Sequence, residues 1–324
     1  MNGTNDLDFL MISAGFEHGG NVTLRLLDGH DELFVYPFES QIGNKHTTDF
    51  LSSMERTQYR YPEFPAGLSA RELYELFYDE ELKTLLRKPN GSKFKTANIE
   101  MKESDRIDAF CKYLENKPYT RANIVAAFFV STFSAWKNYK VSGKNHMYVG
   151  YSPIIGIDAH KILADFPKAH VVHVVRNPLS AYADTKKRPF PLPFHQYVMS
   201  WNLYHHAALV QQSLNPQRMT IVRYEDIVGN TRKTMEMICS RVGIAYSDSM
   251  LHPSFNSKDI TGNIFPWGTI NNATKEENKA TAASLSSEEM KNIIKYSGLM
   301  IKHFGYEDFI HDVANQKIEI AQYA

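Results

Sequence analysis

The chain has 324 residues, and its 36 lysines and arginines equal its 36 aspartates and glutamates in number, so its formal net charge is zero. This balance argues against nucleic acid or an anionic membrane as the main partner, because such partners normally require a basic surface. The apolar content is that of an ordinary globular protein. The longest apolar run, at about 124–136, is too short and too polar to span a bilayer.

The opening residues, MNGTNDLDF, lack the basic, apolar and small-residue order of a signal peptide, so we expect a cytoplasmic protein. The two cysteines, Cys111 and Cys239, make neither a disulfide framework nor a metal-binding pair. We therefore expect reduced thiols and no metal. The length allows one large core, or one core with a helical extension.

The first forty residues predict a buried strand, a glycine-rich turn, a helix and an extended return. In this turn, Gly19 and Gly20 let the backbone bend and present its N–H groups at the positive end of the helix dipole. An anion is expected there. The ATP-binding form of such a loop ends in a lysine and a hydroxyl residue, whereas Asn21 and Val22 follow here, which argues against an ATPase or a kinase.

The middle of the chain predicts helices. Apolar residues recur at helical spacing over 69–86 and 104–116, and a more apolar helix is predicted over 121–139. Together they form a helical insertion at about 50–145, which we expect to cover the acceptor side of the site.

The remainder predicts alternating strands and helices. A helix at about 158–166 between two strands makes a β-α-β unit, and a strand at 221–227 leads into a helix. A Ser-Ser-Glu-Glu cap begins a last helix over 286–304. We therefore predict a single α/β domain over 1–324: a three-layer sandwich with a central parallel sheet, a P-loop-like strand–loop–helix and the helical insertion.

Arg176 directly follows the β-branched run 170–175. An arginine at the carboxyl end of a strand lies in the crevice where open α/β sheets bind ligands. Its fork of donors suits a phosphate or sulfate better than a lysine would. We favour phosphate binding over the alternative, which is an ion pair with an acid such as Glu225 or Asp226.

Together these segments resemble the sulfotransferase family that uses 3′-phosphoadenosine 5′-phosphosulfate (PAPS) and releases adenosine 3′,5′-bisphosphate (PAP). The loop from Phe16 to Thr23 and the following Leu26-Leu27-Asp28-Gly29-His30 are similar to the family's P-R-S-G-T-T-L-L and L-L-D-x-H-P motifs. Arg176-Asn177-Pro178 resembles its R-[DN]-P, and Arg223-Tyr224-Glu225-Asp226 resembles its L-R-Y-E-D-L strand. The resemblance covers the first forty residues and most of 151–274.

Two positions depart from the family pattern. Glu17 stands where the family has a basic residue, so the cation that would meet the 5′-phosphosulfate is missing. Asp184, with Thr185 beside it, stands where the family usually has a serine that binds the 3′-phosphate. The candidate substitutes for the missing cation are His18, Arg25, Thr185 or a nearby lysine.

The resemblance implies an in-line transfer of a sulfuryl group to an acceptor hydroxyl or amine, with a base within hydrogen-bond reach of the acceptor. Glu39, after the return strand, is the first candidate base, because the tyrosyl-protein branch of the family has a glutamate at nearly this place. His18 is the second candidate. The alternatives are an ordinary solvated carboxylate for Glu39 and a packing role for His18. His30 is expected to be structural.

The resemblance also implies a loop that reaches back over the nucleotide, because Pro266-Trp267-Gly268 is similar to the family's P-W-x-G-N-S-S. We expect Trp267 to stack on the adenine, with a core position as the alternative. The predicted nucleotide-binding residues are Phe16, Glu17, His18, Gly19, Gly20, Asn21, Val22, Arg176, Asp184, Thr185, Trp267, Asn271 and Asn272.

The sequence thus predicts a PAPS-dependent sulfotransferase that acts on a carbohydrate or another small acceptor, without nucleic acid or a membrane span. The alternative is a descendant that binds nucleotide or a partner protein without turnover, motivated by Glu17 and Asp184. A nucleoside mono- or diphosphate kinase-like enzyme is disfavoured by the missing lysine. The sequence has no signal for oligomeric state.

Overall fold

A parallel sheet of five strands forms the centre of the protein in a computed structural model, which describes residues 3–53, 55–260 and 275–323. The strand order is β2-β3-β1-β4-β5, and every neighbouring pair is parallel. This confirms the predicted α/β class. The strands are β1 (Asp8–Ala14), β2 (Leu33–Val35), β3 (Met147–Tyr151), β4 (His170–Val175) and β5 (Met219–Arg223).

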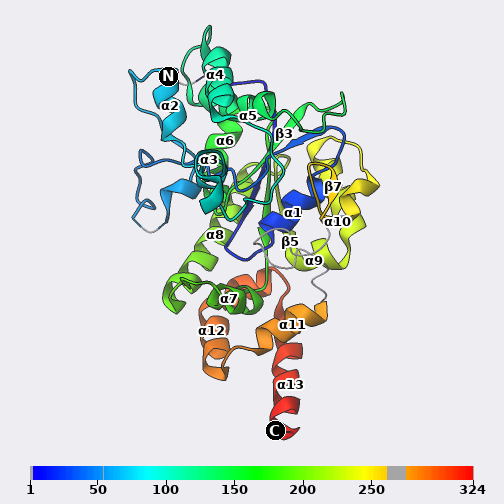
Figure 1. The fold of residues 1–324 in the computed structure, drawn as a ribbon. Coiled ribbons are helices and arrows are strands. Elements are labelled where there is room, and N and C mark those ends of the chain that lie inside the picture. The colour runs from blue at the N-terminus through cyan, green and yellow to red at the C-terminus, as the bar shows by residue number, and fades with distance from the viewer. Residues whose placement is uncertain (1–2, 54, 261–274, 324) are drawn as a thin grey trace.

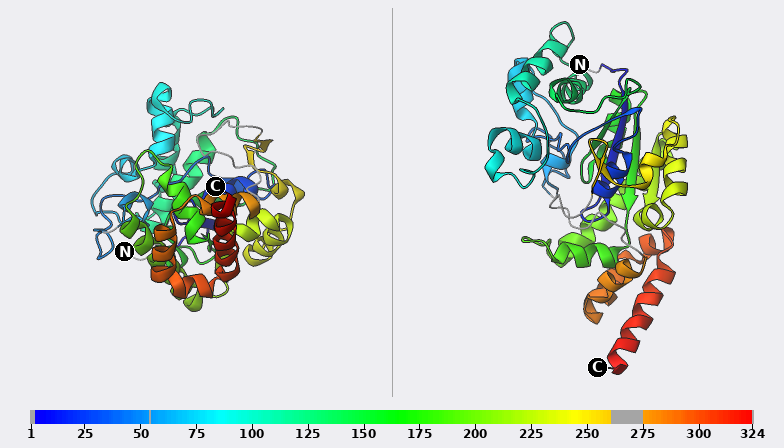
Figure 2. Two further views of the ribbon diagram at one scale, coloured as in Figure 1. Left: turned by 90° about the horizontal axis from the view of Figure 1, so that it is seen from below. Right: turned by 45° about the vertical axis from the view of Figure 1, so that its right-hand side comes forward.

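Helices cover both faces of the sheet and complete three layers, as the right-hand view of Figure 2 shows. Leu10 and Ile12 of β1 pack into one apolar layer, whereas Phe9 and Met11 pack into the other. Successive side chains of a strand point to opposite faces, and both faces of β1 are buried, so its residues from Phe9 to Ile12 are all apolar. The first layer contains α1 (Gly20–Leu27), α9 (Tyr224–Gly229) and α10 (Thr231–Val242), and the second contains α5 (Arg121–Ala135) and α6 (Ala159–Asp165).

The predicted helix over 69–86 is two helices, α2 (Ala70–Leu76) and α3 (Glu80–Arg87). Its periodicity was correct, but the chain breaks at Asp79, whose φ of 37° is left-handed. Tertiary contacts favour the break, because the backbone N–H of Asp79 donates to the carbonyl of Gln41 at 3.0 Å and its carboxylate pairs with the buried Arg106. The next helix is α4 (Glu103–Leu114), close to the predicted span.

The last three helices, α11, α12 and α13, lie at the end of the molecule away from the N-terminus (Figure 1). Ser286 and Glu289 form the predicted capping box. One helix follows the one that we expected to be last, and it projects from the molecule (Figure 1). The bounds of these helices are α11 (Lys275–Ala283), α12 (Ser287–His303) and α13 (Glu307–Tyr323). The elements not yet named are α7 (Pro178–Lys186), α8 (Phe194–Leu214) and a small antiparallel pair, β6 (Ser254–Phe255) and β7 (Lys258–Asp259). None of the described helices has both the length and the apolar content needed to cross a membrane.

A buried polar network fixes the chain after β2 against the helical insertion. Arg106 of α4 is fully buried, forms an ion pair with Asp79 and donates to the Tyr36 hydroxyl at 3.1 Å. The backbone N–H of Asp79 then donates to the carbonyl of Gln41 at 3.0 Å. The network therefore positions the segment that contains Glu39.

Replacing Arg106 by Met should lower the free energy of unfolding by about 3–5 kcal/mol, because the buried Asp79 would lose its partner. Urea unfolding followed by circular dichroism measures this change. Arg71→Met is the control, since Arg71 and Asp108 form an exposed pair, and it should change stability by less than about 0.5 kcal/mol. Equal losses in the two variants would contradict the role of the network.

Candidate active site

The ends of the strands meet at the carboxyl edge of the sheet, where open α/β folds bind ligands. The glycine turn follows β1 there, and Arg176 follows β4. Tyr151 ends β3, and Tyr224 follows β5. Glu39 lies four residues beyond the end of β2. The topology thus gathers at one edge residues that are far apart in the sequence.

The two glycines of the turn are required by close neighbours. Gly19 has a φ of 89°, and a side chain there would overlap the ring of Tyr224. A side chain on Gly20 would overlap the ring of Tyr151. No side chain caps the amino terminus of α1, so its first N–H groups have no side-chain partner at Gly19, and the anion expected there stays a prediction.

Arg176 lies directly against this turn. Its Nη1 donates to the backbone carbonyl of Glu17 at 2.8 Å, and its guanidinium lies 4.8 Å from the ring centre of Tyr224. The helix terminus and the strand-end arginine, which we expected to bind the same ligand, are therefore neighbours in the fold.

The acid that pairs with Arg176 is Asp184, at 2.8 Å. The expected alternative partners lie elsewhere, since Asp226 pairs with Arg223 and Glu225 accepts hydrogen bonds from Asn177. An ion pair with an acid is therefore present, as the alternative had it, but its partner is Asp184, because the helix α7 that follows β4 brings this carboxylate back to the strand end.

A residue that the sequence did not suggest completes the surroundings of Arg176. Asn278 of α11 accepts from Nε at 3.1 Å and from Nη2 at 2.7 Å with its side-chain oxygen. It is almost fully buried. No sequence signal links positions that are a hundred residues apart, so only the tertiary structure identifies this contact.

Thr185 does not face the site. It is fully buried, and its hydroxyl donates to the carbonyl of Ala181 at 2.9 Å within α7. Asp184 also accepts from Lys187 at 2.7 Å. The position that the family fills with a serine is therefore occupied here by a carboxylate with two cationic partners.

His18 belongs to a buried group of histidines behind the turn. Its Nδ1 bonds to the carbonyl of Phe16 at 2.7 Å, and its ring lies 5.3 Å from that of His205. His205 in turn bonds to His173 at 2.9 Å. Burial lowers the pKa of both His18 and His173 to about 3, so these rings are neutral near pH 7. His18 does not supply the missing cation.

Arg25 and His30 are both engaged away from the turn. Arg25 is buried in α1, and its Nη2 donates to the carbonyl of Tyr36 at 2.7 Å. His30 bonds through Nε2 to the carbonyl of Ala245 at 2.7 Å, which is the contact expected of a structural residue.

Glu39 faces a second carboxylate, Glu81. The backbone N–H of Glu39 donates to Glu81 Oε2 at 3.0 Å, and Lys93 forms an ion pair with Glu81 at 2.6 Å. Burial raises the pKa of both carboxyls, and each is raised further by a neighbouring glutamate. Lys93 favours the ionised form of both carboxyls, and the charge of Glu39 raises the pKa of Glu81, so Glu81 is the member of the pair that holds a proton more readily.

Polar side chains surround Glu39 beside the turn, and we call Tyr59, Glu81, Tyr151 and Arg188 the polar cluster. Burial, followed by the charges of Glu39 and Glu17, raises the pKa of the Tyr151 hydroxyl well above its usual value. Burial, followed by the charge of Glu39, also raises the pKa of the Tyr59 hydroxyl. Arg188 pairs with Glu17 at 2.8 Å. Glu81, Tyr151 and Arg188 were missed by the sequence analysis, because nothing in the local pattern distinguishes them.

The remaining predicted residues lie as follows. The ring of Phe16 meets that of Tyr59 edge-on at 5.4 Å. Val22 packs against the first apolar layer, and Asn21 has a buried side-chain oxygen without a partner among the described residues. Trp267, Asn271 and Asn272 lie outside the described residues.

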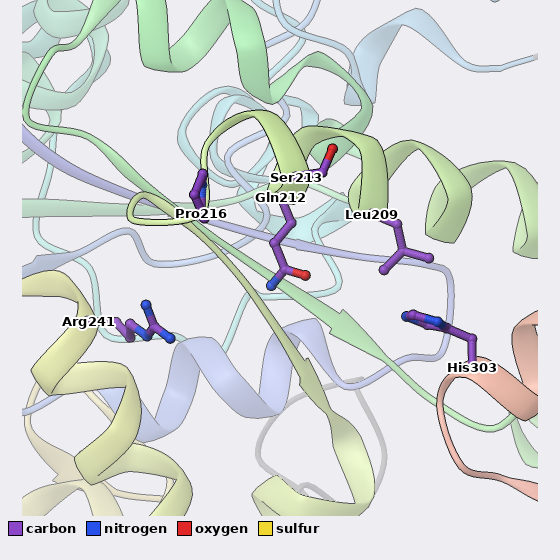
Figure 3. Close-up of a pocket in the computed structure, with 6 residues that line it drawn as sticks. All are labelled: Leu209, Gln212, Ser213, Pro216, Arg241 and His303. Atoms are coloured by element: carbon purple, nitrogen blue, oxygen red, sulfur yellow. The ribbon is translucent and has the colours of Figure 1, made fainter.

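A surface groove lies elsewhere, along the end of α8 and between α10 and α12 (Figure 3). The groove is lined by Leu209, Gln212, Ser213, Pro216, Arg241 and His303. None of these residues belongs to the turn or to the polar cluster, so we do not identify the groove with the site.

Across 3–53, 55–260 and 275–323, no group of three or more histidines, cysteines or acids is arranged to hold a metal ion.

Comparison with known proteins gives a consistent result. The model of a family described as "Sulfotransferase family" matches residues 40–248, which begin after the glycine turn. A solved sulfotransferase domain of the Synechococcus PCC 7002 olefin synthase is 18% identical, with a TM-score of 0.54 over 93% of this chain and 96% of that one. The sulfotransferase domain from the curacin biosynthetic pathway is 16% identical, with a TM-score of 0.47 over 86% and 83%. No curated protein sequence matches significantly.

The buried histidines should make the protein sensitive to acid. The folded pKa of His18, about 3, lies below the value of 6.5 for an exposed histidine. The unfolded chain therefore binds a proton first, and stability falls as pH drops from about 6.5 towards 3. His18→Gln should reduce the slope of unfolding free energy against pH by up to about 1.4 kcal/mol per pH unit, which corresponds to one proton.

Urea unfolding at a series of pH values between about 4 and about 7, where the folded and unfolded histidines differ in charge, measures this slope. The exposed His146→Gln is the control. An unchanged slope for His18→Gln would refute the assignment.

Proposed function

The chain belongs to the sulfotransferase family, and on that premise we propose that it transfers a sulfuryl group from PAPS to a hydroxyl or amine of a carbohydrate or another small acceptor. The observation that supports this most is the contact between Arg176 and the carbonyl of Glu17 at 2.8 Å. It brings a helix terminus and a guanidinium, two anion-binding groups, to one place. A nucleotide with phosphates at both its 3′ and 5′ positions offers an anion to each.

The residues present fit the 5′ end of such a nucleotide. Gly19 and Gly20 have no side chains of their own at the amino terminus of α1, and Asn21 contributes a buried oxygen without a partner among the described residues. Arg176 is the proposed ligand of the 3′-phosphate, since its planar fork can exchange one partner for another. Its present partner, Asp184, would have to give way to the phosphate.

Glu39 is the proposed general base. A base works best when its pKa lies near the working pH, and the burial that raises the pKa of Glu39 shifts it in this direction. Glu81 receives the Glu39 N–H and so fixes the backbone of the base. When bound, PAPS supplies a sulfuryl group whose bond to the 5′-phosphate oxygen breaks as the acceptor oxygen bonds to sulfur. Glu39 takes the proton that the acceptor loses.

The polar side chains around Glu39 support a hydroxylated acceptor. Tyr59 and Tyr151 have hydroxyl groups within electrostatic reach of Glu39, and hydroxyl groups can hydrogen-bond to those of a sugar. We keep Trp267, Asn271 and Asn272 as the proposed adenine contacts, and we propose that the protein works in the cytoplasm as one domain.

A second candidate function is nucleotide or partner binding without turnover. Two observations favour it: Asp184 occupies Arg176, and the carboxylate of Glu17 lies beside the turn. Both acids would repel an anionic ligand. The two functions differ in whether labelled PAPS yields a sulfated product.

Titration with PAP by calorimetry tests nucleotide binding. The wild type should bind, and Arg176→Ala should lose about 2–4 kcal/mol of binding free energy, because a charge-assisted contact is lost. Arg223→Ala is the matched control, since Arg223 also lies at the carboxyl end of a strand but pairs with Asp226. No binding of PAP by the wild type at high micromolar concentration would remove the proposed function, and unchanged affinity of Arg176→Ala would remove Arg176 from it.

Replacing Glu39 by Gln should reduce the formation of sulfated product about 10²- to 10⁴-fold, the usual contribution of a general base. The affinity for PAP should change little, because Glu39 lies on the acceptor side. Product from labelled PAPS and a panel of sugars is the measurement, with the exposed Glu115→Gln as control. Full activity of Glu39→Gln would exclude Glu39 as the base.

In the wild type, kcat/KM should fall as the pH decreases. The midpoint of this fall should lie above the pKa of an ordinary glutamate, because burial raises the pKa of Glu39.

A further inference from the structure

Arg188 reaches the glycine turn from a separate segment that follows α7. Its Nε pairs with Glu17 Oε1 at 2.8 Å, and its guanidinium lies 5.2 Å from the ring centre of Phe16. Both partners belong to the turn. An arginine distant in sequence therefore lies over the loop at the place where the loop itself has an acid.

Other cations near the turn have different partners. Arg176 is held by Asp184 and by Asn278. Lys187, next to Arg188, also pairs with Asp184, at 2.7 Å. Lys186 pairs with Glu289 of α12 at 2.7 Å and so points away from the loop. Arg176 meets the turn at the Glu17 carbonyl, whereas Arg188 is the cation among these neighbours that pairs with the Glu17 carboxylate.

The residues suggested by sequence as substitute cations do not fill this role. His18 is neutral near pH 7 because burial lowers its pKa, Arg25 donates to a backbone carbonyl behind α1, and the Thr185 hydroxyl is bonded within α7. None of the three therefore supplies a positive charge to the polar cluster.

Arg188 also lies within electrostatic reach of the proposed base. Its charge lowers the pKa of Glu39 and of Tyr151, in opposition to the larger effect of burial. The guanidinium, which contacts Glu17 and Phe16 of the turn, is thus also close enough to Glu39 to favour its charged form.

We propose that Arg188 binds the transferred sulfuryl group of the donor, and that Glu17 holds Arg188 over the turn until the donor replaces it. This inference rests on the proposed sulfotransferase function. A guanidinium can donate two parallel hydrogen bonds to sulfuryl oxygens as readily as to the carboxylate it leaves. Arg188 forms no bond to sulfur and accepts no proton, so the acceptor proton still goes to Glu39 and the 5′-phosphate is still the leaving group.

The geometry of Glu17 fits this holding role. Its φ of 63° is left-handed, which is uncommon for a residue with a side chain. In this conformation its carbonyl meets Arg176 while its carboxylate meets Arg188. The ion pair is accessible, with 39% of the Arg188 side chain and 34% of the Glu17 side chain exposed. Exposed pairs are weak, so an incoming anion can exchange with Glu17 at little cost.

The test compares two ligands that differ in the sulfuryl group. Calorimetric dissociation constants for PAPS and for PAP, without an acceptor, are measured for the wild type, Arg188→Ala, Arg188→Lys and Lys187→Ala. We expect Arg188→Ala to raise the ratio Kd(PAPS)/Kd(PAP) by about tenfold or more, the loss of one charge-assisted contact. Arg188→Lys should restore part of this loss. Lys187→Ala, in the same segment, should leave the ratio within about twofold of the wild type. Lys187 is exposed and pairs with Asp184, beside the proposed ligand of the 3′-phosphate, and PAPS and PAP both have that phosphate.

The outcomes separate this inference from the function on which it rests. PAP binding by Arg188→Ala shows that the variant is folded, and an unchanged ratio in that variant would overturn the role of Arg188 alone. A wild type that binds neither ligand would remove the sulfotransferase proposal and this inference with it. An equal rise of the ratio in Lys187→Ala would show a general charge effect and would also overturn the specific role.

Discussion

The hydrogen bond from Arg176 to the carbonyl of Glu17 joins the two halves of the candidate site. It connects the end of β4 to the turn after β1, and these strands are neighbours in the sheet. The guanidinium needs several partners because it is nearly buried, and it finds them in Asp184 and in Asn278 of α11. One side chain therefore ties the glycine turn, α7 and a carboxyl-terminal helix into a single arrangement.

The position of Glu39 depends on a second buried cation. Arg106 pairs with Asp79 and with the Tyr36 hydroxyl, so the chain after β2 is held against the helical insertion. That contact brings Glu81 to the N–H of Glu39. The insertion thus supplies the carboxylate beside the proposed base, whose pKa burial raises.

Charge at the turn is arranged differently from the family pattern that the sequence resembles. The acid Glu17 occupies the place of a basic residue, and Arg188 approaches it from the segment after α7. The histidine of the turn, His18, is neutral because burial lowers its pKa, and it packs beneath the turn. Neither rearrangement follows from the residue types alone, since the same glutamate and histidine could equally have faced solvent.

The sequence by itself determined the sheet class, the glycine turn before α1, the strand-end Arg176 and the capping box of α12, because each depends on local periodicity, backbone freedom or short-range hydrogen bonds. It could not determine the break at Asp79, the pairing of Arg176 with Asp184, or the approach of Asn278 and Arg188. Those depend on which buried charges meet across the fold, and a buried charge takes its partner from whichever element is packed against it. Only the tertiary structure decides that.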